Sequence, residues 1–496
     1  MSHGPATDTR LRTLPGFSPL YLDFVEGAPG ALGLLPARTD LGFLSSLAPF
    51  LSAVSPDCGG TIRILMENLQ ETNASGASSP AISNLRAGRC VTVASIHVPA
   101  LFGGPFSELL KALTAAGLAA KLNRSGVAAA AVCCIGAAGP KPAAHQTAGF
   151  RDREGGFYEH VFPLEGGPQQ EAVRLTGGVT DFLERFDSRL GTDIRGTDIY
   201  RIVKQSHLPG ALLNTAWGTV YRALLAGRGT VALDLAQPAL QELRRPVIED
   251  KRENLRRVVG DFYRRLRCAG YGPVPSREDL DDCLAPGSVC DAVLMLSAAF
   301  PIAVVIAGPE QLPDIGAASA CASILQRRSV LLCHRASATI ADRRSLAILT
   351  RHGIAFEDIF VDVETLLRRI GYGTSGDGAA QALGAMEVDM QESFSRLACL
   401  LRPQQANRAK VRKIRTRARH QLRRLAERTA RARLRRSDDM RRQLEKVCGK
   451  LAPNGRLQES QLTTMQVLAE HSPAAVKAIG DRLDIQDSNH QIIALD

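Results

Sequence analysis

The sequence lacks any apolar run long enough to cross a membrane as a helix, which takes about 18 to 20 residues. Its longest apolar segments, 127–135 and 298–307, have the length of buried strands. The N-terminal residues contain no apolar core of the kind found in secretory signals. We therefore expect a cytoplasmic protein with no membrane partner.

Metal and disulfide patterns are missing as well. The eleven cysteines are scattered without a C-x-x-C pair, and Cys133 and Cys134 lie next to each other in an apolar segment. An odd number of cysteines without metal-ligand spacing predicts reduced, mostly buried thiols. We expect no metal centre. The sequence also has no G-x-S-x-G or H-E-x-x-H motif, so no motif identifies a catalytic residue.

The excess of positive over negative charge is confined to one segment. The net charge is +11, yet residues 402–442 alone contain 17 Lys and Arg against three acidic residues. This segment has no aromatic residues, and no named nucleic-acid-binding motif occurs. A solvated coiled-coil face is the favoured interpretation, and nucleic acid is not the expected partner. Binding of phosphate, a nucleotide or nucleic acid remains an alternative.

Apolar segments alternate with helical patterns through the middle of the chain. Continuous apolar strands of this kind are typical of a parallel sheet covered on both faces. We predict an α/β fold with a Rossmann-like core over 90–375, with insertions at about 140–228 and 236–290, and with residues 1–89 joining the core. The expected strands are 90–98, 127–135, 229–235, 301–308 and 329–334.

The pattern becomes long, helical and highly charged after the core. Ser437, followed by Asp438 and Asp439, has the pattern of a helix start. We therefore predict that two helices meet near Arg436 in an antiparallel hairpin within a coiled-coil domain over 376–452. Residues 453–496 are expected to form a turn, a last helix and a short final strand that return to the core.

A glycine turn precedes a helical pattern in the stretch HVPALFGGPFSELLKAL, residues 97–113. Gly103, Gly104 and Pro105 would let an anion approach the start of a helix, with Lys111 about two turns along. The stretch is neither a Walker motif nor G-x-G-x-x-G. The pattern alone favours a structural turn, with an anion site as the alternative.

A second candidate follows the expected strand 329–334. Arg335 could hold a phosphate or carboxylate through its planar fork, with Ser337 and Thr339 close by. Doubly wound sheets bind ligands at the carboxyl ends of their strands, where this arginine would lie. The alternative is a capped helix start that carries a surface arginine.

Several stretches, in this order, resemble the bacillithiol-biosynthesis family BshC. The most specific matches are HRASATIADRRSLAILTRHGIAFEDIF and PNGRLQES, residues 334–360 and 453–460. Others cover most of the chain: FSPLYLDF (17–24), LFGGPFSELLKALTAAGLAAKL (101–122), GTVALDLAQPALQELRRPV (229–247), AGPEQL (307–312) and HQIIALD (490–496).

The resemblance implies a Rossmann-like core with connecting insertions, and a coiled coil that forms a homodimer. It also implies a ligase that adds cysteine to the amine of glucosaminyl malate, with ATP or ADP as nucleotide. The implied substrate- or nucleotide-binding residues are Gly103, Gly104, Pro105, Lys111, Gly308, Pro309, Arg335, Ser337, Thr339, Asn454 and Gln458.

The sequence departs from the family pattern at polar positions. The family's TGQQ precedes the glycine turn, but here His97 and Val98 replace the paired glutamines. The family's EDHD motif corresponds to AAGPK, 137–141. His97 is thus a candidate catalytic replacement. The alternative function is an impaired relative that keeps the fold, the dimer and nucleotide binding; a nucleic-acid-binding protein is a third interpretation.

Overall fold

The computed structural model describes residues 9–35, 67–69, 79–136, 147–152, 156–162, 164–165, 173–190, 198–272, 280–369, 378–400, 405–471 and 475–495. The segment 137–141 and most of the N-terminal region 1–89 lie outside these ranges. The chain divides into two units, which are 1–344 with 449–496, and 345–448. No helix among the described residues is long and apolar enough to span a membrane.

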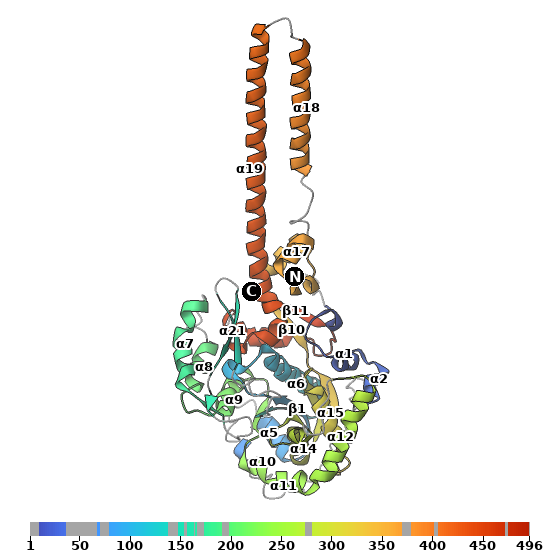
Figure 1. Ribbon diagram of the computed structural model, residues 1–496. Coiled ribbons are helices and arrows are strands. Elements are labelled where there is room, and N and C mark those ends of the chain that lie inside the picture. Colours follow the sequence, from blue (N-terminus) through green and yellow to red (C-terminus); the bar gives the residue numbers. More distant parts are fainter. Residues whose placement is uncertain are drawn as a thin grey trace. The chain divides into compact units, whose positions relative to one another are not determined.

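A five-stranded parallel sheet forms the centre of the first unit (Figure 1). Its order is β7-β2-β1-β8-β9. Numbered along the chain, the five strands run 3-2-1-4-5, which is the Rossmann order. The predicted α/β fold class is therefore confirmed. The strands are β1 (Val91–His97), β2 (Ala129–Ile135), β7 (Val231–Asp234), β8 (Ile302–Ala307) and β9 (Leu331–His334).

Alternate strand residues enter two different cores, because successive side chains of a strand point to opposite faces. Ile96, Cys134 and Val305 belong to the core on one face, together with α5, α12, α14 and α15. Val93 and Cys133 face the other side, where α6 and α9 cover the sheet. These helices are α5 (Ser79–Arg86), α6 (Phe106–Arg124), α9 (Leu213–Leu224), α12 (Arg252–Cys268), α14 (Val289–Ala299) and α15 (Leu312–Ala320).

Shorter elements surround this core. Two small antiparallel sheets, β3–β4 and β5–β6, lie in the first expected insertion. Their bounds are β3 (Thr147–Arg151), β4 (Phe157–Val161), β5 (Leu164–Glu165) and β6 (Arg174–Leu175). The remaining helices up to the last sheet strand are α1 (Pro19–Glu26), α2 (Pro29–Leu32), α7 (Gly177–Leu190), α8 (Asp198–Ser206), α10 (Pro238–Glu242), α11 (Arg244–Val247) and α13 (Leu280–Cys283).

The C-terminal segment pairs with the strand that follows β9. β10 (Ser337–Asp342) and β11 (His490–Leu495) form a separate two-stranded parallel sheet. The expected final strand is confirmed. The alternative for Arg335, a capped helix start with a surface arginine, is wrong, because Arg335 is buried and a strand follows it. Ser337, Thr339 and Ala341 alternate with Ala338 and Ile340 in a fully paired strand. The next helices are α16 (Arg343–Arg351), α20 (Gln458–Gln461), α21 (Thr464–Ala469) and α22 (Ala475–Arg482).

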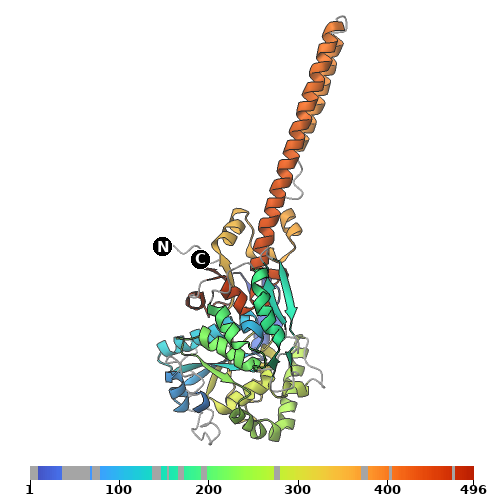
Figure 2. The same ribbon diagram turned by 90° about the vertical axis from the view of Figure 1, so that its left-hand side faces the viewer.

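The second unit contains two long antiparallel helices that lie side by side (Figures 1 and 2). They are α18 (Gly378–Leu400) and α19 (Gln405–Leu451), and Arg419 Nε donates to Glu387 Oε1 over 3.1 Å between them. The unit also includes α17 (Val363–Arg369). The break predicted near Arg436 is wrong, because α19 continues through Ser437. The strong helix-forming Arg and Leu residues around it outweigh the capping signal.

Candidate active site at the strand-order switch point

The sheet reverses its winding direction between β1 and β8. Open α/β sheets bind ligands in the crevice outside the carboxyl ends of their strands at this point. His97 is the last residue of β1, and Gly308 directly follows β8. A Cβ placed on Gly308 would lie 3.8 Å from Arg335 Nε and 4.0 Å from Gln311 Oε1. The fold thus brings three chain segments together at one edge of the sheet: the end of β1, the turn 308–311 after β8, and Arg335 after β9.

The turn after β1 has three consecutive residues with positive φ: Phe102 at 58°, Gly103 at 84° and Gly104 at 68°. A bulky residue in this region needs support from its surroundings. Phe102 is fully buried, and its backbone N–H donates to His207 Nε2 over 3.1 Å. Burial lowers the pKa of His207 to about 4, which keeps this nitrogen an acceptor. His207 therefore positions the turn.

The glycine turn is also fixed from outside. Gly103 O accepts hydrogen bonds from the Tyr221 hydroxyl and from Thr464 Oγ1, each over 3.1 Å. Gly104 N donates to Leu101 O over 2.9 Å, and Phe106 N at the start of α6 donates to Leu462 O over 3.0 Å. Two backbone donors that could hold a phosphate are thus engaged within the protein.

Glu108 adds negative charge to the first turn of α6. It opposes an anion at this helix start, where the helix dipole alone would favour one. With the engaged donors, this charge means that the residues of the turn do not fit a nucleotide phosphate. Phosphate binding by Gly103, Gly104 and Pro105 stays a prediction, and the geometry argues for the structural turn.

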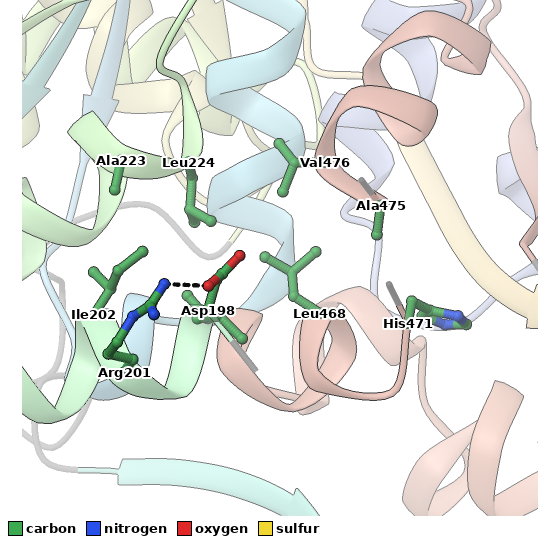
Figure 3. A pocket seen from close by; sticks show the side chains of 10 residues that line it. Asp198, Arg201, Ile202, Ala223, Leu224, Leu468, His471, Ala475 and Val476 are labelled. Carbon is green, nitrogen blue, oxygen red and sulfur yellow. Dashed lines mark hydrogen bonds and ion pairs between the residues drawn. The ribbon is translucent and has the colours of Figure 1, made fainter. Parts of the chain in front are cut away.

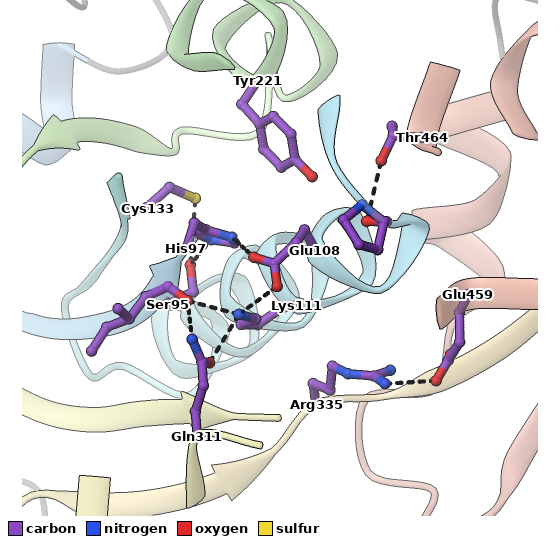
Figure 4. Close-up of polar contacts among 12 residues, drawn as sticks. Ser95, His97, Glu108, Lys111, Cys133, Tyr221, Gln311, Arg335, Glu459 and Thr464 are labelled. Atoms are coloured by element: carbon purple, nitrogen blue, oxygen red, sulfur yellow. Dashed lines mark hydrogen bonds and ion pairs between the residues drawn. The ribbon is translucent and has the colours of Figure 1, made fainter. Parts of the chain in front are cut away.

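Three ionisable residues meet at the end of β1 (Figure 4). His97 Nδ1 lies 2.7 Å from Glu108 Oε2, and Lys111 Nζ lies 2.9 Å from Glu108 Oε1. The side chains of His97 and Lys111 are 0% and 3% exposed, whereas that of Glu108 is 14% exposed. The carboxylate is consequently the member of this cluster that solvent or a ligand can reach.

Lys111 acts as an internal brace. Its ammonium has three N–H donors, and these have three acceptors: Glu108 Oε1, Ile96 O at 2.7 Å and Gln311 Oε1 at 2.9 Å. Gln311 Nε2 also donates to Ile96 O over 3.1 Å, which ties α15's preceding turn to β1. In this arrangement no donor of Lys111 is left for a bound anion.

The charges of the cluster are fixed by burial and by each other. Burial alone would raise the pKa of Glu108, but the positive charge of Lys111 and the hydrogen bond from His97 lower it to about 2. Burial lowers the pKa of His97, so the ring is neutral, with Glu108 opposing the shift. Neutral His97 donates through Nδ1 to Glu108, and its Nε2 accepts from Ser95 Oγ over 2.8 Å. Both ring nitrogens are therefore engaged, and His97 orients Glu108.

A second buried cluster contains other predicted site residues. Glu459, which is fully buried, accepts from Arg335 over 2.6 Å, from Ser337 Oγ over 3.0 Å and from the backbone N–H of Ala338 over 2.9 Å. His490 lies between Ser337 Oγ at 2.7 Å and Thr339 Oγ1 at 2.8 Å. We call this group, Arg335, Ser337, Thr339, Glu459 and His490, the β10–β11 clamp.

The remaining predicted residues have separate places. Gln458 hydrogen-bonds both the N–H and the carbonyl of Ile340, and also Lys450 O, so it extends the clamp. Pro309 lies half-buried in the turn after β8. Asn454 is exposed, with a φ of 55°, in the turn that precedes α20. Among the described residues, no group of His, Cys, Asp and Glu could hold a metal ion.

A hollow of about 330 Å³ lies elsewhere in the first unit (Figure 3). It is lined mostly by aliphatic side chains, with Asp198 ion-paired to Arg201 at its margin and His471 to one side. Burial lowers the pKa of His471. None of the predicted site residues lines this hollow, so the chemistry is expected at the switch point.

Sequence comparison places these features in a family. Residues 338–495 match the sequence model described as "Bacillithiol biosynthesis BshC, C-terminal coiled-coil domain". Relatives named "Putative cysteine ligase BshC" align with most of the chain. That of Koribacter versatilis is 22% identical, covering 95% of this chain and 96% of the relative. The chain is thus similar to BshC proteins over most of its length, and its C-terminal third is similar to their coiled-coil domain.

Two further BshC relatives agree with this assignment. The Solibacter usitatus protein is 21% identical and covers 84% of this chain and 87% of its own length. The Salinibacter ruber protein is 23% identical over 65% of this chain and 67% of its own. Both bear the same printed name as the first. The family match over 338–495 includes Thr339, Glu459 and His490 of the β10–β11 clamp, but not Arg335 and Ser337.

Sequence reasoning missed several groups of the switch-point site. The contact between Glu108 and His97 was not expected. The two residues are eleven positions apart in the sequence, and an irregular turn lies between them. Trp217 and Tyr221 come from α9 and belong to no motif, and Gln311 lies in the matched stretch AGPEQL but was not singled out. The one available signal was the acidic residue in the first turn of the helix that follows the glycines.

Proposed function

We propose that the chain is a carbon–nitrogen ligase that joins the carboxyl group of cysteine to the amine of glucosaminyl malate. The names of its relatives support a cysteine ligase, and the amine of glucosaminyl malate as acceptor follows from the family resemblance. The observation that carries the proposal is the Glu108 carboxylate, held by His97 and Lys111 at the switch point and still 14% exposed. A fixed, ionised carboxylate at this place suits an amine-containing substrate.

The reaction forms a C–N bond and removes one carboxyl oxygen. A carboxylate is a poor electrophile, so this oxygen has to leave with a phosphoryl or nucleotidyl group from a nucleoside triphosphate, as predicted from the family. The glycine turn does not fit the phosphates, and we derive no step through the nucleotide. With a pKa of about 2, Glu108 is ionised at neutral pH. It therefore suits binding and orienting an ammonium group better than taking up its proton.

An impaired relative that keeps the fold is the second candidate. It is favoured by the complete engagement of Lys111 and of both His97 nitrogens within the protein. In this case neither residue is available to a substrate. Both candidate functions include the homodimer predicted through 376–452 and nucleotide binding, so neither property separates them.

The two candidates are separated by product formation. Purified protein is incubated with glucosaminyl malate, cysteine and ATP, and the thiol product is detected by mass. The ligase proposal expects product with wild type and at least tenfold less with Glu108→Gln, because the ammonium then loses its charged partner. Absence of product with wild type, while nucleotide still binds, would support the impaired relative.

A further inference from the structure

The stretch 410–428 of α19 presents a dense run of positive charge to solvent. Residues 393–426 contain no Asp or Glu, and Glu387 of the neighbouring α18 pairs with Arg419. The charge of this stretch is therefore almost entirely of one sign. All its Lys and Arg side chains are exposed, namely Lys410, Arg412, Lys413, Arg415, Arg417, Arg419, Arg423, Arg424 and Arg428.

Five of these side chains form one stripe along the helix. At the rotation of an α-helix, about 100° per residue, they fall within a sector of about 60°. The side of α19 that packs on α18 is marked by the partly buried Val411, Ala418 and Leu422, about 130° around the helix from the stripe (Figure 1). The stripe is about 27 Å long. We call this group the α19 stripe: Lys410, Lys413, Arg417, Arg424 and Arg428.

The α19 stripe weakens its own helix. Lys413 lies three residues after Lys410 and four before Arg417, and Arg428 lies four after Arg424. Like charges at these spacings are neighbours on a helix surface and repel each other. A face that only keeps a protein in solution usually carries both signs, whereas none of the five side chains has an ion pair within the described part of the chain. The stripe therefore suits a negative partner from outside the chain.

The length and composition of the stripe select the kind of anion. A free phosphate or a single nucleotide would reach only one or two of its side chains, whereas nucleic acid carries phosphates along the whole stripe. A membrane-bound helix needs an apolar face, but the residues between the stripe positions in the same sector are His420 and Gln421. A second copy that used the same patch would bring the same positive charge.

We propose that the α19 stripe binds the phosphate backbone of nucleic acid. Its lysines and arginines neutralise phosphates and release condensed counterions, which drives binding of this kind. The stretch 410–428 has no aromatic residue that could stack on bases and no motif that reads base edges, so the contact is independent of base sequence. The stripe belongs to the second unit and the switch-point site to the first, so the inference does not depend on the ligase proposal.

Salt dependence tests the proposal on the full-length protein. A fluorescein-labelled DNA duplex of about 24 base pairs is titrated with protein, and the anisotropy gives the Kd. Five phosphate contacts predict that the Kd rises about 500-fold between about 50 and 200 mM NaCl. Duplexes of unrelated sequence should bind equally. Absence of binding at the lower salt concentration, or a Kd that does not respond to salt, would overturn the proposal.

A triple substitution removes most of the stripe. Lys413→Gln, Arg417→Gln and Arg424→Gln are combined, because glutamine is uncharged and keeps a high helix propensity. Circular dichroism should show unchanged helix content. With two phosphate contacts left, the Kd should rise only about tenfold over the same salt range. A salt response equal to that of wild type would contradict the assignment to the stripe.

A matched control separates the stripe from net charge. Arg257→Gln, Arg264→Gln and Arg267→Gln remove three exposed arginines from α12 in the first unit and change the net charge by the same amount. This variant should keep the affinity and the salt response of wild type. Equal losses in the two triple variants would show that net charge alone governs binding and would overturn the proposal.

Competition separates nucleic acid from other polyanions. Polyglutamate offers carboxylates without phosphates, and vesicles that contain phosphatidylserine offer an anionic lipid surface. The duplex should stay bound in the presence of an equal charge concentration of either competitor. Preferred binding of polyglutamate or of vesicles, lost in the stripe variant, would assign the stripe to an acidic protein segment or to a membrane surface and would reject nucleic acid.

Discussion

Two buried polar clusters of the first unit differ in how many of their hydrogen-bonding groups have a partner within the protein. In the β10–β11 clamp, Glu459 is paired with Arg335 and receives two further hydrogen bonds, and His490 is held on both sides. At the switch point, Glu108 is partly exposed and the nearby Trp217 N–H is unpaired. The first arrangement is a closed structural joint, and the second leaves groups for a ligand.

The comparison teaches that charge alone does not mark the site. Arg335, Ser337 and Thr339 had the residue types of a ligand site in the sequence, yet their contacts lie within the clamp. Glu108 and Trp217 belong to no motif but keep unused hydrogen-bonding capacity. The predictions that follow compare the stability of the clamp with the openness of the switch point.

The largest loss of stability is expected from opening the clamp. Glu459→Gln leaves the buried Arg335 without its counter-charge, which typically lowers the free energy of unfolding by about 3–5 kcal/mol. Urea unfolding measures the loss. The control is Asp261→Asn, which breaks the exposed ion pair with Arg264 and should change stability by about 0.5 kcal/mol or less. A similar, small effect of both substitutions would refute the clamp.

The clamp should also make stability depend on pH through His490. Burial lowers its pKa to about 4, with Glu459 opposing and Arg335 adding to the shift. As the pH falls below about 6.5, His490 therefore takes up a proton in the unfolded chain but stays neutral in the folded one. This difference favours unfolding. From pH 7 to 4.5 this residue alone should cost about 2.5 kcal/mol. Unfolding of His490→Gln across this range should lack that contribution; an unchanged pH slope would contradict it.

The corresponding change at the switch point should cost less stability. After Glu108→Gln, Lys111 keeps Ile96 O and Gln311 Oε1 as acceptors. We expect the free energy of unfolding to fall by about 1–3 kcal/mol, the cost of an impaired buried charge contact. A loss larger than that of Glu459→Gln, measured in the same urea series, would show that the switch point is the tighter structural joint.

The smallest difference in stability is expected between two glycine substitutions. Gly104→Ala and Gly88→Ala each place a side chain at positive φ, 68° and 61°, at a cost of about 1–3 kcal/mol. Open space surrounds Gly88, whereas Gly104 borders Trp217 and Glu108. Only Gly104→Ala should lower product formation, because its turn leads directly into α6, which carries Glu108. Full product formation by this variant would show that the turn does not position Glu108.

The main sheet was predictable because continuous apolar runs such as 127–135 and 301–308 have few alternatives to buried parallel strands. The β10–β11 pair was not, since its members are joined by contacts across 153 residues. The periodicity of apolar residues predicts only local secondary structure. It does not predict which distant strands pair with each other. The helix start predicted at Ser437 was wrong for a different reason. Its capping signal is local, but the strong helix formers on both sides of it continue α19 through this residue.

The candidate site was predictable only in outline. The glycine turn does follow β1, as its sequence pattern predicted, but its hydrogen bonds to Tyr221 and Thr464 involve residues far away in the chain. Lys111 carried the charge expected of a ligand residue, and burial beside Glu108 turned it into a brace. A side chain's use depends on which neighbours satisfy it, and the sequence does not show these neighbours.

The central claim is tested most directly by the indole N–H of Trp217. Because the chain has one tryptophan, a ¹⁵N-labelled sample gives a single indole N–H resonance in the folded protein. Saturating L-cysteine should shift this resonance, because the indole ring lies 5.0 Å from that of His97, which holds Glu108, and Glu108→Gln should abolish the shift. An indole resonance that stays unchanged at saturating L-cysteine would contradict the account.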